Sequence, residues 1–192
     1  MMKPDLPIDR LLVGASGSIG VVELPAYLAT FRAALAKQVR VIMTASAVAM
    51  IPAHTIAFFC DRVFREHENS LQQQPGHIQL TQWADMFVVL PASVNILAGA
   101  ANGMAQNLLT TSILASPKPV VFCPNTNDLM WDKPATQRNL QTLRNDGHVV
   151  MEPDLVEAYD VDTGEMGRGR TLPPPEELIP RLLDVYRGLE FS

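Results

Sequence analysis

The chain has little of what several classes of protein require. It contains two cysteines among 192 residues, Cys60 and Cys123, and each lies in an apolar stretch. Such thiols suit a buried position in a reducing compartment better than a disulfide, and neither has the spacing of a metal site. The apolar runs also stay well short of the ~18 residues that a membrane span needs. We therefore expect a cytoplasmic protein with no metal and no membrane partner.

Basic residues are few as well. The chain has 15 Lys and Arg against 20 Asp and Glu, a net charge of -5, and no basic cluster. Nucleic-acid binding needs a basic footprint, so this balance argues against a nucleic-acid partner. With 192 residues, 47% of them hydrophobic, the chain can bury one sizeable core but is short for two. We expect one domain over residues 1–192.

Short apolar runs alternate with segments of helical spacing. The runs are 11–13, 39–43, 86–90, 120–123 and 149–151. This alternation predicts an α/β fold with a doubly wound, Rossmann-like parallel sheet. The spacing of apolar residues predicts two sheet-covering helices. The residues concerned are Val22, Tyr27, Leu28, Phe31 and Leu35 in the first, and Leu140 and Leu143, after Pro134, in the second.

Residues from about 155 to 173 contain too much Gly and Pro for a regular element. Gly164, Gly167 and Gly169 lie close together, and three prolines follow. We expect a mobile clamp there, followed by a final helix from Glu176 to Leu189.

A polar loop, residues 124–131, directly follows the strand predicted at 120–123. Asn125 and Asn127 place amide donors and acceptors beyond the carboxyl end of a strand, where an open α/β sheet binds its ligand. The loop therefore indicates carboxylate recognition, although its Asn content alone is more typical of a turn.

Small residues fill the junction after the first predicted strand. Residues 14–20 read Gly-Ala-Ser-Gly-Ser-Ile-Gly, which lets backbone N–H groups approach an anion at a helix N-terminus. The segment lacks the lysine of a Walker A loop and the glycine spacing of a dinucleotide fingerprint. By its chemistry it predicts either a phosphate site or a simple turn.

A third polar segment, residues 90–96, leaves the strand predicted at 86–90. Ala92 and Ser93 are small enough for a flat ring to lie against the backbone, and Asn95 can meet the polar edge of such a ring. Ser93 is also a candidate N-cap for a following helix. His77 lies ahead of this strand, where a lone histidine is more often structural than catalytic.

Together these segments resemble the flavin-dependent cysteine decarboxylases. Residues 124–131 are similar to the PxMNxxMW element of that family, with Thr126 in place of Met, and residues 90–96 are similar to its PASANT motif, with two substitutions. Residues 17–19 match its GSI phosphate element, and His77 matches its active-site histidine. The motifs occur in family order over most of the chain.

The resemblance implies a cofactor and a role for each of these residues. The cofactor would be FMN, with FAD as the alternative. The catalytic residues would be His77, which takes the thiol proton of a cysteine, and Asn127, which holds the carboxylate. The cofactor-binding residues would be Gly14, Ser16, Gly17, Ser18, Ile19, Thr44, Ser46, Pro91, Ala92, Ser93 and Asn95. The substrate-binding residues would be Asn125, Met130, Trp131, Thr163 and Gly164.

Within the family, the chain looks most like the mersacidin- and epidermin-type peptidyl-cysteine decarboxylases, which act on ribosomally made, modified peptides. Residues 162–170 resemble the clamp of phosphopantothenoylcysteine decarboxylase, but Thr163 replaces the cysteine that serves reduction of the ene-thiol there. A Thr hydroxyl lacks the acidity and redox chemistry of a thiol. The implied reaction is therefore oxidative decarboxylation of the C-terminal cysteine of a precursor peptide, which stops at the ene-thiol while the flavin takes the hydride.

Two other functions of this family stay open. Phosphopantothenoylcysteine decarboxylation in coenzyme A biosynthesis is disfavoured by Thr163 and by the absence of the synthetase domain often fused to that enzyme. A flavin-binding regulatory subunit without turnover is disfavoured because His77 and Asn127 are both present. The family builds its sites between subunits, so we expect a homo-oligomer, a trimer or a dodecamer, that packs through residues 98–106. Gln106 departs from the Asp usual there.

Overall fold

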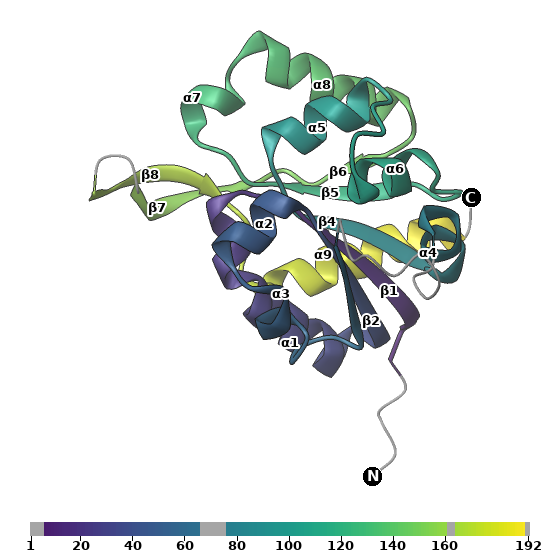
Figure 1. Cartoon of the computed structure of the whole chain (residues 1–192). Helices are drawn as coiled ribbons and strands as arrows, with labels where there is room; N and C mark the ends of the chain where they lie inside the picture. The colour runs from purple at the N-terminus through teal and green to yellow at the C-terminus, as the bar shows by residue number, and fades with distance from the viewer. Residues whose placement is uncertain (1–5, 66–75, 161–163, 191–192) are drawn as a thin grey trace.

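The computed structural model describes residues 6–65, 76–160 and 164–190, and Figure 1 shows a sheet with helices on both faces. The strands of this sheet are β1 (Ile8–Ala15), β2 (Ala36–Met43), β3 (Arg62–Arg65), β4 (Met86–Ala92), β5 (Val120–Pro124) and β6 (Val149–Val150). The helices are the 3₁₀ turn η1 (Ile19–Glu23), α1 (Leu24–Ala34), α2 (Ala45–Met50), α3 (Ala53–Ile56), α4 (His77–Trp83), α5 (Val94–Ala101), α6 (Leu108–Leu114), α7 (Asp128–Trp131), α8 (Pro134–Asn145) and α9 (Pro175–Glu190). None of the helices described is long and apolar enough to cross a bilayer.

The six strands run parallel in the order β3-β2-β1-β4-β5-β6. The chain builds outward from β1 to β3 on one side and then from β4 to β6 on the other. The strand order therefore reverses between β1 and β4, and the crevice beyond the carboxyl ends of these two strands is where such sheets bind ligands. The predicted doubly wound fold is confirmed, and so are the five predicted strands and the helices at 134–145 and 175–190.

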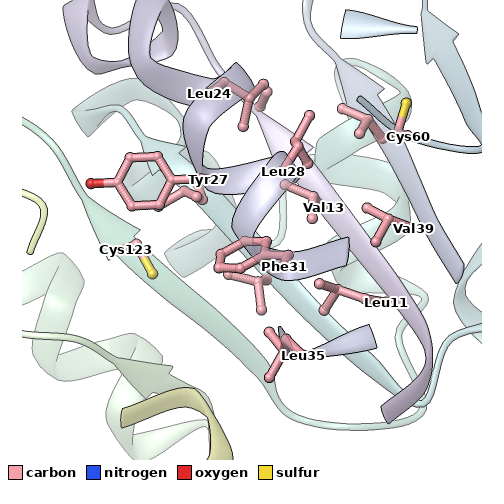
Figure 2. Packing of buried hydrophobic residues seen from close by; sticks show 14 of the residues in the cluster. Leu11, Val13, Leu24, Tyr27, Leu28, Phe31, Leu35, Val39, Cys60 and Cys123 are labelled. Carbon is pink, nitrogen blue, oxygen red and sulfur yellow. The ribbon is translucent and has the colours of Figure 1, made fainter. Parts of the chain in front are cut away.

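Two hydrophobic cores lie on the two faces of the sheet. Successive residues of a strand point to opposite faces, so Leu11 and Val13 enter the core under α1 and α9, whereas Leu12 enters the core under α5, α6 and α8. Figure 2 shows the first core, where Phe31 of α1 lies near Leu11 of β1 and Tyr27 lies on the side of Cys123 of β5. The sheet is thus buried on both sides, as a parallel sheet requires.

Two details of the helices and strands differ from the sequence expectation. Val22 was expected on the buried face of the first helix, but it is 52% exposed. It lies in the 3₁₀ turn η1, which precedes α1, so its side chain does not continue the buried face of α1. Strand β3 was not predicted, since its four residues include two arginines and only one β-branched residue. It pairs with β2 alone, and charge suits such an edge strand.

The expectation that residues from about 155 to 173 contain no regular element was wrong, whereas their role as a mobile clamp stays a prediction. This region contains an antiparallel hairpin of β7 (Asp154–Asp160) and β8 (Glu165–Thr171), with pairing from Asp154 opposite Thr171 to Asp160 opposite Glu165. Glycine weakens a strand but does not forbid it, so Gly167 and Gly169 are tolerated in β8. Gly164, at φ 73°, supplies the left-handed conformation near the tip. Figure 1 shows the hairpin extending beyond one end of the sheet.

Candidate active site

The turns after β1 and β4 are joined through Ser16. The Ser16 hydroxyl donates to the carbonyl oxygen of Pro91 at 2.7 Å and accepts the Ser93 N–H at 2.8 Å, while the Ser16 N–H also donates to Pro91 at 3.2 Å. The side chain is 1% exposed. Its only hydroxyl hydrogen is therefore already used, and Ser16 sets the distance between the two turns instead of offering a donor to a ligand.

The turns after β1 and β2 touch at Gly17 and Ser46. A Cβ atom on Gly17 would lie 2.4 Å from the Cβ of Ser46, so only glycine fits at this position. Thr44 caps α2 by accepting the Ala47 N–H at 3.2 Å, which leaves its own hydroxyl hydrogen available. Among the described residues, the N–H groups of Gly17 and Ser46 have no hydrogen-bond partner. Backbone donors, the Thr44 hydroxyl and a helix N-terminus thus meet at one point, which suits an anion.

Gly14 has a different environment from the one expected. It lies within β1, and a Cβ there would come 2.3 Å from a methyl group of Leu109 on α6. The absence of a side chain therefore permits close packing of α6 on the sheet. Ile19 begins η1 and is 48% exposed, so it borders the crevice from the side of the first turn.

Asn125 links the loop after β5 to the turn after β1. Its Oδ1 accepts the Gly20 N–H at 3.1 Å and the hydroxyl of Ser18, and its own N–H donates to the Ala92 carbonyl at 3.1 Å. Ser18 also donates to the Asn125 carbonyl at 2.9 Å. Asn125, buried at 8% exposure, thus joins the turn after β1 through its side chain and the end of β4 through its backbone N–H. Its direct contact with substrate stays a prediction.

Asn127, two residues after Asn125, is exposed. It is the N-cap of α7, where its Oδ1 accepts the Met130 N–H at 2.9 Å. Its amide nitrogen has no partner among the described residues, so its two hydrogens are free to donate to a ligand. Met130 is 42% exposed, whereas Trp131 is 5% exposed and packs into the second core.

Small residues connect the end of β4 to α5. Ala92 is buried at the end of β4, and Ser93 is in the N-cap position of α5 with no side-chain capping bond. The predicted position of Ser93 is therefore right, and its hydroxyl stays available for a ligand. Asn95, in the first turn of α5, is exposed.

His77 does not join this group within one chain. It is the first residue of α4, which packs against α6 and β1. Figure 1 shows α4 at the far side of the molecule from α2 and α7, whose N-termini border the crevice. The carboxyl edge of the sheet thus carries most of the predicted cofactor-binding residues and the loop with Asn127, whereas Gly14 packs against α6 and His77 lies apart.

The other titratable groups of interest are structural. His148 accepts the Val120 N–H on Nδ1 at 3.1 Å, and burial lowers its pKa, so it stays neutral. Burial raises the pKa of the Cys60 thiol to about 11 and that of Cys123 to about 12. Both cysteines are free and buried, as predicted, and neither forms a reactive thiolate at neutral pH.

One contributor to this region was not predicted. Arg170 of β8 places its Nε 3.4 Å from Oδ1 of Asp128 and its guanidinium carbon 5.4 Å from the centre of the Trp131 ring. The hairpin is thereby attached to the loop that carries Asn127. The Arg-Gly-Arg pattern of β8 was the only sequence signal of this contact. Thr163 lies outside the described residues, and Gly164 is near the hairpin tip.

These features fit a flavin nucleotide. The cradle that a Cβ on Gly17 would fill, with its backbone donors, suits a phosphate. The uncapped hydroxyl of Ser93, beside this cradle through Ser16, suits the polar edge of a ring. A parallel sheet with such a cradle at its switch point is typical of nucleotide-binding α/β proteins.

Comparison with known proteins identifies the family. A family model described as Flavoprotein matches residues 2–173, and the chain belongs to this family. It is 43% identical to mersacidin decarboxylase of Bacillus sp. (strain HIL-Y85/54728), over 94% of this chain and 91% of that protein. A solved structure of EpiD with the substrate peptide DSYTC is similar with a TM-score of 0.85, at 28% identity over 92% of this chain and 99% of that one. The FMN-dependent cysteine decarboxylase SpaF has a TM-score of 0.70, at 36% identity over 83% of this chain and 89% of that one.

Proposed function

We propose that this protein is a flavin-dependent decarboxylase that oxidatively decarboxylates the C-terminal cysteine of a precursor peptide. The product is an ene-thiol, which serves aminovinyl-cysteine formation in lantibiotic biosynthesis. Similarity to mersacidin decarboxylase over most of both chains supports the activity. The peptide DSYTC, bound by a structural neighbour, ends in cysteine and supports the class of substrate.

The orientation of the Asn127 amide carries the proposal. Its oxygen is fixed by the Met130 N–H, so its nitrogen faces outward and can donate to a carboxylate. These hydrogen bonds come from a neutral group, and they weaken as the negative charge of the carboxylate passes to the developing ene-thiolate and CO2 departs uncharged. The ground state is therefore not over-stabilised relative to the transition state.

FMN is the cofactor that we propose for the crevice. The N–H groups of Gly17 and Ser46 and the Thr44 hydroxyl would hold its phosphate, while Ser93 and Asn95 would meet the polar edge of its ring. The SpaF neighbour is FMN-dependent, which supports FMN over FAD. When bound, the flavin supplies the acceptor for the hydride from the cysteine Cβ.

His77 is the proposed base that accepts the thiol proton. A general base must come within about 3 Å of the group it deprotonates, and α4 does not lie at the crevice of its own chain. We propose that a neighbouring subunit provides His77, in a trimer or in a dodecamer of four trimers. Ile78 of α4 is 53% exposed and Leu114 of the adjacent α6 is 60% exposed, and such apolar surface supports a subunit contact.

Thr163 is proposed to end the reaction at the ene-thiol. Two electrons and a proton leave as hydride, the thiol proton goes to the base, and the carboxylate departs as CO2. With Thr in place of Cys at position 163, the clamp lacks the acidic thiol that would serve return of the hydride from the reduced flavin to the ene-thiol. We propose a cytoplasmic location, where a precursor peptide is made.

Mass spectrometry of a peptide ending in cysteine tests the proposal. The holoenzyme should release a product lighter by CO2 and two hydrogens, with oxygen reoxidising the flavin. His77→Asn should abolish turnover while the protein stays yellow, because the histidine moves a proton and does not hold the cofactor.

The matched control is 4′-phosphopantothenoylcysteine as a competing substrate. Turnover confined to that compound, or a product that has lost CO2 alone, would refute peptidyl-cysteine oxidation and indicate the coenzyme A activity. A protein that binds neither FMN nor FAD would refute the proposal altogether.

A further inference from the structure

Buried polar atoms without hydrogen bonds gather at the contact between the hairpin and the Asn127 loop. In the described part of the chain, four buried side-chain polar atoms lack a hydrogen-bond partner, and three of them belong here: Thr126 Oγ1, Asp128 Oδ1 and Arg170 Nε. Burying a polar group without a hydrogen bond raises the free energy of the folded state, unless the group interacts with another polar group or has a functional role. Asp128 and Arg170 face each other at 3.4 Å, so their opposite charges offset part of that cost.

The same arginine is held from a second side. Its guanidinium lies 5.4 Å from the centre of the Trp131 ring, and Trp131 is fixed in the second core. Asp128 is the first residue of α7 and directly follows Asn127, the N-cap. Any shift of the hairpin therefore acts on the helical turn that orients the Asn127 amide.

We propose that Arg170 and Asp128 are a positioning pair that fixes the Asn127 turn to the hairpin. The inference rests on the proposed function, in which Asn127 holds the peptide carboxylate. The pair makes carboxylate recognition depend on the position of the hairpin. It raises the affinity for the peptide and takes no part in proton transfer or in binding the flavin.

A double-mutant cycle in the holoenzyme tests the pair. Arg170→Gln and Asp128→Asn should each raise KM for the cysteine-terminated peptide by about fivefold. We expect kcat within about twofold of the original value and an unchanged flavin content, because Arg170 acts through Asn127. The double variant should be no worse than the poorer single variant, since either change removes the same interaction. Arg170→Lys, which keeps the charge, should recover part of the loss.

Two control variants match these changes. Asp132→Asn removes an exposed carboxylate from the other end of α7, and Arg187→Gln removes an exposed arginine, paired with Asp184, from α9. Both should leave KM unchanged. Effects that add in the double variant, or a KM unaffected by the single variants, would overturn the proposal.

A measurement without peptide separates this proposal from the proposed function. Hydrogen–deuterium exchange of the hairpin amides, residues 154–160 and 164–171, should become faster by about the same factor in both single variants and in the double variant. If no cysteine peptide is turned over at all, the proposed function fails, and the exchange cycle still decides the pair. Unchanged exchange would show that Arg170 does not hold the hairpin.

Discussion

Replacement of Gly17 by alanine tests the anion cradle through one added methyl group. The new Cβ would lie 2.4 Å from the Ser46 Cβ and 3.1 Å from its carbonyl carbon. Ordinary contact begins at 3.4 Å, so the N-terminus of α2 must move away from the turn by about 1 Å. Such overpacking costs about 1–3 kcal/mol, a fall in Tm of about 3–10 °C for a chain of this size. The displaced N–H donors should also weaken flavin binding by about tenfold or more.

Flavin titration by fluorescence and thermal unfolding of the apoprotein measure these two effects. Gly17→Ala with Ser46→Gly removes the closest contact and should restore part of both losses. Gly188→Ala in α9 is the matched control, because nothing lies within 4 Å of its added Cβ. Normal flavin affinity and an unchanged Tm in Gly17→Ala would refute the cradle.

Two further predictions concern the histidines. Burial lowers the pKa of His148, so below about pH 6.5 the unfolded state binds more protons and the free energy of unfolding falls with falling pH. His148→Gln should reduce this pH dependence, measured by urea unfolding between pH 7.5 and 5.5. Equal slopes of unfolding free energy against pH in the two proteins would contradict this prediction. Co-expression of His77→Asn with Asn127→Asp subunits should recover roughly a quarter of the original turnover, since random mixing leaves that share of shared sites intact. No recovery in mixed oligomers would show that His77 and Asn127 act from the same chain.

Strands and helices whose apolar residues follow a pattern of burial could be predicted from the sequence. Residues 39–43 and 120–123 are apolar because both faces of the sheet are covered, and they became the inner parts of β2 and β5. The polar junctions were also readable, because parallel strands bring their carboxyl ends to one edge. Ser16 and Ser93 therefore meet although 77 positions separate them.

Contacts between residues that are far apart in the sequence could not be predicted from it. Whether the Ser16 hydroxyl binds a ligand or a carbonyl depends on the position of Pro91, which no local pattern specifies. The hairpin was missed because strand pairing can compensate for glycine, and the gain comes from the partner strand. The contact of Arg170 with Asp128 joins residues from two separate elements, so spacing could not predict it.

The division of the site has a consequence for how the enzyme works. In the proposed arrangement, one chain supplies the anion cradle, the Ser93 hydroxyl and the Asn127 amide at a single edge of its sheet. Hydrogen bonds of Ser16 and Asn125 join the turns at this edge, and the Met130 N–H holds the Asn127 oxygen. These groups can hold a flavin and a carboxylate but cannot accept the thiol proton. In the oligomer that we propose, α4 of a neighbouring subunit supplies the base, so peptide binding and proton transfer are separable and turnover depends on assembly. An isolated chain should then retain flavin without oxidising peptide, because only the oligomer brings the base to the cysteine.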